Sequence, residues 1–405
     1  MGYNTWNAFH GDIDEDVVKS TADLMVELKL KDAGYEYLVM DDAWANKARG
    51  ADGKVEGNSY RFPSGIKSVA DHTHAAGLKF GIYSDAGLTT CLGYPGGRFY
   101  EHSDAESFAS WDVDFLKYDN CAAVASDWVV DRYVAMRDAL NATGRPILFS
   151  LCVWGVADPW IWAQDVGNTW RTTDDIQDNY NSMVANLDNT IGLAQFAGPG
   201  TWNDPDLLEV GNPGMNIHEQ RAHFALWALL KSPLLISADL RSIEQESLDI
   251  LLAEELIAVN QDPLGVAGDL IWKQGPLEVY AGPLEGGSRA VVMFNRHSPG
   301  TQYPNHKMTV NFTWLGYNAD AHVTVRDLYK RKDLGTFRGS FTGAVWVHDV
   351  LALKVTPQKP SKDDDSWRPW GPGTLFPKQE SRHRSRSHAD ISKHESLYAA
   401  LEHES

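Results

Sequence analysis

The sequence lacks the features that place a protein in a membrane or on a nucleic acid. It has no apolar run of about eighteen residues, the minimum that a membrane-spanning helix needs. Basic residues are fewer than acidic ones: the chain has 36 Lys and Arg and 55 Asp and Glu, which gives a formal net charge of −19. Phosphate backbones and anionic membrane surfaces both attract basic proteins. The composition therefore argues against either partner and suits a neutral substrate.

Cysteine is scarce as well. The three cysteines, Cys91, Cys121 and Cys152, form neither a CxxC pair nor a cluster with histidine of the kind that holds zinc. We therefore expect no metal and no cofactor. Cys91 and Cys121 each follow the end of a predicted strand, so a bridge between these two ends can form and leaves Cys152 as the odd thiol.

A secretion signal is missing too. Met1 is followed at once by Gly2 and Tyr3, with neither a charged segment nor an apolar segment in front of them. Taken literally, this start predicts a cytosolic protein.

Short apolar segments alternate with amphipathic ones up to about residue 265. Helical patterns lie between most of the apolar segments, for example at 16–28, 102–110, 128–140 and 219–230. Eight strands that alternate with helices predict a (β/α)8 TIM barrel, and the length suits one. The predicted strands cover 2–6, 37–40, 79–83, 113–117, 147–151, 169–171, 200–202 and 234–236.

The pattern changes after a turn cluster at 260–265. Period-two runs separated by Gly, Pro and Asn then predict a C-terminal antiparallel β-sandwich. From residue 358 the apolar content falls and charge blocks of opposite sign follow, which predicts a disordered tail. We expect a catalytic barrel over 1–265, a sandwich over 266–357 and a charged tail over 358–405. The period-two runs are 277–280, 290–294, 309–312, 322–325 and 350–355.

Polar residues follow most of the predicted barrel strands. Side chains from several strand ends converge on one face of such a barrel, and this face carries the chemistry. The clearest case is Lys117-Tyr118-Asp119-Asn120, which ends the apolar strand; its alternative interpretation is a structural ion pair. Scattered surface aspartates would not follow strand ends so regularly. The strand-end residues are Trp6, Asp41, Asp42, Asp85, Asp119, Cys152, Asp175 and Asp206.

Two carboxylates on opposite sides of an anomeric carbon can hydrolyse a glycosidic bond. One attacks the carbon, while the other protonates the leaving oxygen and later activates water. Asp119 is the candidate nucleophile, and Lys117, two residues earlier and so on the same inward face, can help to keep it ionised. The second carboxylate is Asp174 or Asp175, and the spacing alone does not choose between them. Arg171 before them can orient a carboxylate or a sugar oxygen.

Five segments resemble the signature segments of glycoside hydrolase family 27, the family of α-galactosidases and α-N-acetylgalactosaminidases. They occur in order within residues 1 to about 356. The resemblance implies a retaining hydrolase on a TIM barrel with a C-terminal β-sandwich. The segments are Met40-Asp41-Asp42-Ala43-Trp44, Gly81-Ile82-Tyr83-Ser84-Asp85, Lys117-Tyr118-Asp119-Asn120-Cys121, Trp170-Arg171-Thr172-Thr173-Asp174-Asp175-Ile176 and Trp202-Asn203-Asp204-Pro205-Asp206.

The resemblance also implies the catalytic pair. It puts the nucleophile on Asp119 and the acid/base on Asp175, so that Asp174 becomes a neighbour. The two carboxylates of a retaining enzyme face each other at roughly 5–5.5 Å. Two carboxylates that are far apart, or at different ends of the barrel, would contradict this interpretation.

The sugar contacts are implied in the same way. Trp6 resembles the aromatic wall of the sugar site. Asp41 and Asp42 resemble a pair that accepts hydrogen bonds from the 4- and 6-hydroxyls; their alternative role is a helix cap or a turn. Such a buried carboxylate would disfavour the wrong 4-epimer by about 1–3 kcal/mol. The further sugar contacts implied are Tyr83, Lys117, Arg171 and Asp206, of which Asp206 can equally be a turn residue.

The resemblance also implies roles for all three cysteines. It pairs Cys91 with Cys121 in a disulfide that fixes the loop after Asp119 and forms part of the pocket wall. Cys152 and Trp154 resemble the plant and fungal α-galactosidase arrangement, whose bulk leaves room for only a hydroxyl at the 2-position. Val153 between them departs from many relatives, which carry glutamate.

The resemblance changes the expected location. Family members carry further residues and a secretion signal before this first segment, so Met1 resembles an internal methionine of a longer, secreted precursor. Asn141-Ala142-Thr143 and Asn311-Phe312-Thr313 are acceptor sequences for N-glycosylation. We therefore expect a secreted protein.

The sequence thus predicts an α-galactosidase that releases terminal α-linked galactose with retention, through a covalent galactosyl-enzyme. Its expected partner is an α-galactoside oligosaccharide or polysaccharide, and the sequence leaves the oligomeric state open. The alternatives within the family are an α-N-acetylgalactosaminidase and a β-L-arabinopyranosidase. Two others are a metal-dependent hydrolase on the same barrel and a galactose-binding protein without turnover.

Overall fold

The computed structural model describes residues 1–300 and 304–358. Within these ranges no helix is both long enough and apolar enough to cross a bilayer. The predicted tail from residue 358 lies, apart from Gln358, outside the described residues.

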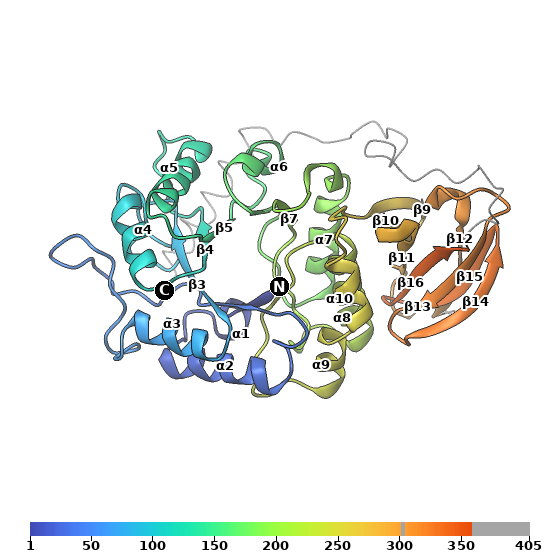
Figure 1. Ribbon diagram of the computed structural model, residues 1–405, viewed down its shortest axis with the longest axis horizontal. Helices are drawn as coiled ribbons and strands as arrows, with labels where there is room; N and C mark the ends of the chain where they lie inside the picture. Colours follow the sequence, from blue (N-terminus) through green and yellow to red (C-terminus); the bar gives the residue numbers. More distant parts are fainter. Residues whose placement is uncertain (301–303, 359–405) are drawn as a thin grey trace. The chain divides into compact units, whose positions relative to one another are not determined.

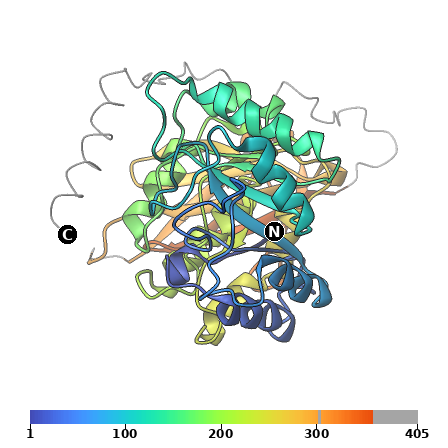
Figure 2. The same ribbon diagram turned by 90° about the vertical axis from the view of Figure 1, so that its left-hand side faces the viewer.

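The predicted barrel is confirmed. Its eight strands pair in parallel in the order β7-β6-β5-β4-β3-β2-β1-β8, and a parallel bridge between Leu208 and Ile236 joins the two ends. Figures 1 and 2 show the helices outside the strands, as in a TIM barrel. The strands are β1 (Gly2–Asn4), β2 (Tyr37–Val39), β3 (Lys79–Asp85), β4 (Phe115–Asp119), β5 (Leu148–Leu151), β6 (Thr169–Arg171), β7 (Trp202–Asp204) and β8 (Leu235–Ile236).

Four strands differ from the sequence prediction by two residues at one end or both, and they are the first, third, fourth and seventh. The third strand ends two residues later than expected, and the whole fourth strand lies two residues later. Trp6, expected at the end of the first strand, begins a short helix instead, because the Asn4 side chain accepts a hydrogen bond from the Trp6 backbone N–H (2.8 Å) and turns the chain. The seventh strand begins two residues later than expected. Residues 198–201 form a turn in which Gly198 and Thr201 exchange backbone hydrogen bonds, and Gly200 has a φ of +89°.

The helices follow the strands as the amphipathic pattern predicts. Local signals fix some of their starts: Asp14 caps α2 through the backbone N–H of Val17, and Asn216 with Glu219 forms a capping box on α8. The helices are α1 (Trp6–Phe9), α2 (Glu15–Glu27), α3 (Ile66–Ala75), α4 (Glu101–Ser110), α5 (Val129–Ala142), α6 (Pro159–Trp162), α7 (Tyr180–Thr190), α8 (Ile217–Leu229), α9 (Gln245–Leu251) and α10 (Glu254–Asn260).

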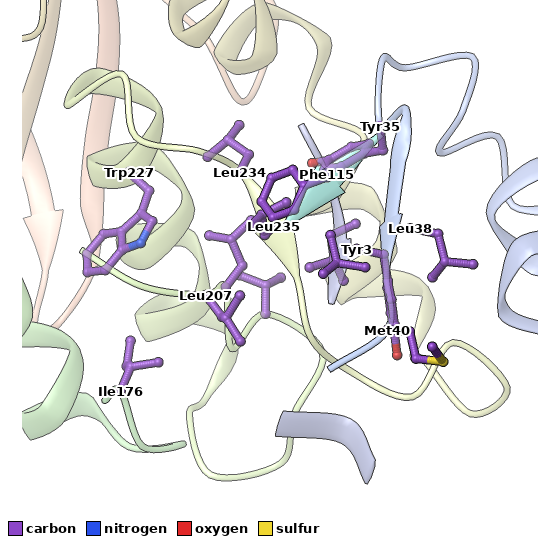
Figure 3. Packing of buried hydrophobic residues seen from close by; sticks show 14 of the residues in the cluster. Tyr3, Tyr35, Leu38, Met40, Phe115, Ile176, Leu207, Trp227, Leu234 and Leu235 are labelled. Carbon is purple, nitrogen blue, oxygen red and sulfur yellow. The ribbon is translucent and has the colours of Figure 1, made fainter. Parts of the chain in front are cut away.

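The centre of the barrel is apolar. Figure 3 shows Phe115 of β4, Leu207 and Leu235 of β8, and these three side chains line one cavity with the polar residues above them. Gly81 of β3 is needed next to them, since a Cβ there would lie 2.8 Å from Cγ2 of Val39. Phe115, Leu207 and Leu235 form the apolar part of the cavity lining, which we call its apolar floor.

The predicted sandwich is confirmed as well. A six-stranded antiparallel sheet, in the order β14-β13-β16-β11-β10-β9, is accompanied by a two-stranded sheet of β12 and β15. Three of its strands, β9, β14 and β15, were not predicted. The strands are β9 (Asp269–Gln274), β10 (Leu277–Pro283), β11 (Arg289–Asn295), β12 (Asn305–Asn311), β13 (His322–Asp327), β14 (Lys332–Arg338), β15 (Ser340–Trp346) and β16 (Val350–Pro357).

Candidate active site

The strand register brings the predicted residues to one edge of the barrel. Tyr83 of β3 pairs with Lys117 of β4, and Asp85 pairs with Asp119. Because side chains alternate along a strand, Lys117 and Asp119 point to the same side. Lys117 and Arg171, with Cys152 and Asp206, line the cavity whose floor is apolar.

Asp119 is buried and held by several donors. Only 6% of the residue is exposed; Tyr83 donates its hydroxyl to Oδ2 (2.8 Å) and the Asn120 backbone N–H donates to Oδ1 (2.9 Å). The Tyr133 hydroxyl donates to the Asp119 backbone carbonyl (3.1 Å). Burial raises the pKa of Asp119 to about 6, with a further rise from the charge of Asp175 and an opposing effect from Lys117. Asp119 is therefore largely ionised at neutral pH.

Lys117 is paired with Asp41 rather than with the nucleophile candidate. Its Nζ lies 2.8 Å from Asp41 Oδ2, which also accepts a hydrogen bond from the Asn4 side chain (2.7 Å). Burial acts to lower the pKa of Lys117, but the negative charges around it, of which Asp41 has the largest effect, together outweigh burial and raise the pKa well above its usual value. Lys117 thus stays protonated and keeps Asp41 in a fixed position.

Asp42 anchors a loop. Its carboxylate accepts hydrogen bonds from the backbone N–H groups of Ala43 (2.6 Å) and Leu92 (3.0 Å), and burial raises its pKa. Leu92 follows Cys91, so that this carboxylate also positions the disulfide.

Arg171 joins two carboxylates. Its Nη2 lies 2.9 Å from Asp175 Oδ1 and 3.0 Å from Asp206 Oδ2, and its Nη1 contacts the Cys152 sulfur (3.5 Å). The Asp175 side chain is 48% exposed, while Asp206 is buried. Arg171 and Lys117 lower the pKa of Asp175 although burial acts in the opposite direction. Asp174 is exposed.

Asp206 holds a strained backbone. Its φ is +86°, in the region that favours glycine, and three hydrogen bonds keep it there: its N–H donates to Asp204 Oδ1, its carbonyl accepts from the Trp227 indole, and its Oδ2 accepts from the Ile176 backbone N–H. Such strain is concentrated at functional sites. Asp206 therefore serves the turn and at the same time faces Arg171.

The predicted disulfide is confirmed. Cys91 and Cys121 are bonded, and Cys91 Sγ lies 3.5 Å from Asp119 Oδ2. Asp85 supports the bridge because its carboxylate accepts the backbone N–H of Cys121 (2.9 Å). Donor atoms of Asp85, Asp119 and the two cysteines lie within 4.8 Å of one another, but the sulfurs are bonded to each other and are not available as metal ligands.

Two tryptophans were predicted as sugar contacts, and neither lines the cavity described above. Trp6 is half-buried at the start of α1. Trp154 has a φ of +53°, and its indole Nε1 is buried without an acceptor among the described residues. An orphaned donor of this kind is available to a bound ligand.

A hydrogen-bonded network at Asn7, the residue after Trp6, was not predicted from the sequence. Glu209 is 1% exposed and accepts hydrogen bonds from the side chains of Asn7 and Asn212. Ser237 accepts the Asn7 backbone N–H (2.8 Å) and donates to the Asn4 carbonyl (2.8 Å). No local signal marks this network, because apart from Glu209 and Asn212 its partners lie 202 to 233 positions apart in the chain.

Comparison with known proteins agrees with this geometry. A family model described as alpha galactosidase A matches residues 1–262, and one described as the alpha galactosidase C-terminal beta sandwich domain matches residues 274–355. Alpha-galactosidase 3 of Arabidopsis thaliana is 48% identical over 369 residues, which cover 90% of this chain and 83% of the relative.

Two solved structures have the same fold. Alpha-galactosidase I from Mortierella vinacea has a TM-score of 0.83 at 35% identity and covers 88% of this chain and 96% of its own. An α-galactosidase from Saccharomyces cerevisiae, solved with raffinose, has a TM-score of 0.81 at 29% identity, with 88% and 97% covered.

Fold and site together define a glycoside hydrolase. More narrowly, the chain belongs to the α-galactosidase A family. It is a retaining enzyme that hydrolyses terminal, non-reducing α-D-galactosyl residues through a covalent galactosyl-enzyme.

Proposed function

We propose that this α-galactosidase uses Asp119 as its nucleophile and Asp175 as its general acid/base. One contrast carries the assignment: Asp119 is buried and held by Tyr83, whereas the Asp175 side chain is 48% exposed. The nucleophile reaches the anomeric carbon from the closed end of the pocket. The acid/base protonates the leaving group, which is the rest of the substrate and must extend out of the pocket on an open side.

The reaction follows from these positions. An Asp119 oxygen attacks the anomeric carbon while Asp175 gives its proton to the glycosidic oxygen, and the alcohol leaves. Asp175 then takes a proton from water, the water oxygen attacks the same carbon, and Asp119 is released. Two inversions at one carbon give net retention.

The pKa of Asp175 in the free enzyme is lower than a general acid needs, because Arg171 is its partner. A bound galactoside covers the exposed half of Asp175 and offers Arg171 a second acceptor. Both changes disfavour the charged carboxylate and raise its pKa in the complex. The free enzyme thus holds Asp175 in place, and the substrate brings it to the protonated form.

The remaining residues recognise galactose. Asp41, kept in position by Lys117 and Asn4, is available to an axial 4-hydroxyl, and an epimer that leaves it unpaired loses about 1–3 kcal/mol. The other contacts in this proposal are Trp6, Asp42, Tyr83, Cys91, Trp154, Arg171 and Asp206. The buried Cys152 beside Arg171 restricts the 2-position to a hydroxyl and so favours galactose over N-acetylgalactosamine.

The substrates that suit this site are neutral α-galactosides, either oligosaccharides or polysaccharides. The solved relative with raffinose supports the former class. The disulfide supports secretion, since such bonds persist in oxidising compartments. Asn141 of the first acceptor sequence is exposed, as glycosylation requires.

Rescue by azide tests both roles. Azide reacting with an Asp175→Ala variant captures the galactosyl-enzyme and yields the α-galactosyl azide. In an Asp119→Ala variant azide replaces the nucleophile and yields the β-galactosyl azide. NMR of the products from nitrophenyl α-galactoside distinguishes the two anomers.

Asp174→Ala is the matched control because it removes the neighbouring exposed carboxylate. We expect it to keep its activity and to give no azide product. An α-galactosyl azide from the Asp174 variant would assign the acid/base role to Asp174. If no variant gave the β-galactosyl azide, Asp119 would not be the nucleophile.

A further inference from the structure

Exposed apolar side chains are concentrated on the catalytic edge of this protein. In the described part of the chain ten large apolar side chains are exposed, and five of them lie in only two loops. These loops follow β3 and β4, the strands that carry Tyr83 and Asp119. We call the five residues the rim strip: Leu88, Leu92, Phe99, Tyr100 and Trp128.

Arg98 connects the two most exposed rings of the rim strip, Phe99 and Trp128. Arg98 packs against the face of Phe99, with its guanidinium carbon 4.4 Å from the ring centroid. The same guanidinium binds Asp127 (2.6 Å), the residue before Trp128. Trp128 is 66% exposed and Phe99 is 64% exposed. The Phe99 ring is thus held by Arg98, the loop before Trp128 is bound to the same guanidinium, and both rings face water.

The rim strip is continuous with the sugar site. Leu92 donates its backbone N–H to Asp42 and follows Cys91, whose sulfur lies 3.5 Å from the Asp119 carboxylate. The disulfide joins the two loops at the pocket. Farther out, the backbone N–H of Leu88 donates to Ala122 in the second loop (3.1 Å), and that of Arg98 donates to Gly87 (3.1 Å).

The chemistry of the rim strip selects among possible occupants. Exposed apolar groups that gather in one place mark a binding surface rather than chance. Aromatic rings offer broad apolar faces, and sugar rings have an apolar face of matching size. The occupant must also tolerate a protein of formal charge −19, which repels acidic partners. A neutral carbohydrate meets all of these conditions.

We propose that the rim strip binds the neutral sugar chain to which the terminal galactose is attached. The substrate of this enzyme is then a polysaccharide or a long oligosaccharide with α-galactosyl side groups, rather than a short galactoside alone. This inference rests on the proposed function of the Asp119 site, since the galactose in the pocket determines where the rest of the chain runs.

The test compares a polymer with a small substrate. In the double variant Phe99→Ala/Trp128→Ala, we expect the KM for galactomannan to rise roughly tenfold, from two lost stacking contacts. The kcat/KM for nitrophenyl α-galactoside, which does not reach the rim strip, stays at the wild-type value. Because both side chains face solvent, the fold tolerates their removal, and thermal unfolding checks this.

Trp346→Ala is the matched control. Trp346 is a tryptophan of similar exposure, 50%, on strand β15 of the sandwich. We expect it to change neither substrate's kinetics. As a second measurement, the inactive Asp119→Asn variant should be retarded by galactomannan in affinity electrophoresis, and the rim double variant in the same background should lose this retardation.

Three results would overturn the proposal. The first is an unchanged KM for galactomannan in the folded double variant, and the second is equal losses on both substrates. The third is a wild-type enzyme that sediments as a dimer and a double variant that sediments as a monomer, since the rim strip would then bind a second copy. Failure of the proposed function looks different, because the Asp119 and Asp175 variants would then not give the expected azide products, whatever the double variant does with galactomannan.

Discussion

At the scale of single residues, the site is governed by how each carboxylate is held. Asp41 has Lys117 as its partner, and Asp175 and Asp206 share Arg171. Asp119 has no cation within contact distance among the described residues and depends on neutral donors, chiefly Tyr83. The pKa of Asp119 is about 6, so that a fraction of Asp119 is protonated just below neutral pH.

We therefore predict an acidic limb in the pH profile of kcat/KM. Activity should fall as the pH drops through about 6, because Asp119 must be ionised to attack. In Tyr83→Phe the hydrogen bond that favours the ionised form is lost. The limb should then move to higher pH, by roughly one unit. Initial rates with nitrophenyl α-galactoside between pH 4 and about 8 measure it.

Tyr133→Phe provides the control for this shift. Tyr133 is also a buried tyrosine beside Asp119, but it donates to the backbone carbonyl and not to the carboxylate. Its variant should keep the limb near 6. An unmoved limb in Tyr83→Phe would show that another group titrates there.

At the scale of elements, the gap between β7 and β8 is where the barrel depends on side chains. A single bridge between Leu208 and Ile236 replaces a full strand pairing. The buried Glu209 then joins Asn7 of α1 to Asn212, and Asn212 donates to the Ser237 carbonyl (3.0 Å). This network fixes α1, which begins with Trp6.

Glu209→Gln should weaken substrate binding more than catalysis. Both carboxyl oxygens of Glu209 accept from Asn side chains, and the nitrogen of the amide cannot accept, so one hydrogen bond is lost and α1 moves. We expect the KM for nitrophenyl α-galactoside to rise about threefold to tenfold, with a smaller change in kcat. Steady-state kinetics give the two parameters separately.

Glu278→Gln is the matched control, because Glu278 is also a fully buried glutamate but belongs to β10 of the sandwich, where it pairs with Arg296 (2.9 Å). Both variants should unfold at lower temperature, and only the Glu209 variant should change KM. If both raised KM equally, the effect would be one of general stability.

The same elements show what the sequence could and could not predict. The alternation of apolar strands with amphipathic helices predicted the barrel, because each long element carries its own period. The first helix has only four residues, too few for a period, and β14 is exposed at most positions and so lacks the alternation that marks a half-buried strand. Short and edge elements are fixed by contacts made elsewhere in the fold.

The site divides in the same way. Residues such as Lys117 and Asp119 could be found because they follow a strong strand, and the pairing of Cys91 with Cys121 came from a family resemblance. The role of Glu209 could not be found, since a glutamate in a loop looks solvent-exposed until its distant partners are known. The choice of Asp175 over Asp174 remains a prediction that azide rescue tests.

At the scale of the whole molecule, several buried carboxylates make stability depend on pH. Burial raises the pKa values of Asp119 and Asp204 to about 6 and that of Glu209 to about 8. These values exceed those of an unfolded chain, roughly 4. At these three carboxyls the native state therefore binds more protons than the unfolded state between about pH 4 and about 8. Burial lowers the pKa of His223 to about 3, and this group acts in the opposite direction.

The free energy of unfolding should consequently fall as the pH rises through this window. The stabilisation is complete below about pH 4 for these groups and is lost as each folded pKa is passed. Urea midpoints at pH 5, 6.5 and about 8 measure the slope. Glu209→Gln should flatten it between 6.5 and 8, and a stability that rises with pH in wild type would contradict the account.

The cystine between the third and fourth strand ends has a practical consequence for making this enzyme. A reducing host would leave Cys91 and Cys121 as free thiols, while the barrel core, which contains neither, would still assemble. Such a preparation would look folded by circular dichroism and gel filtration, although the pocket wall of some molecules would lack the disulfide that fixes it. Yield should therefore be judged by titrating active centres, not by the amount of folded protein.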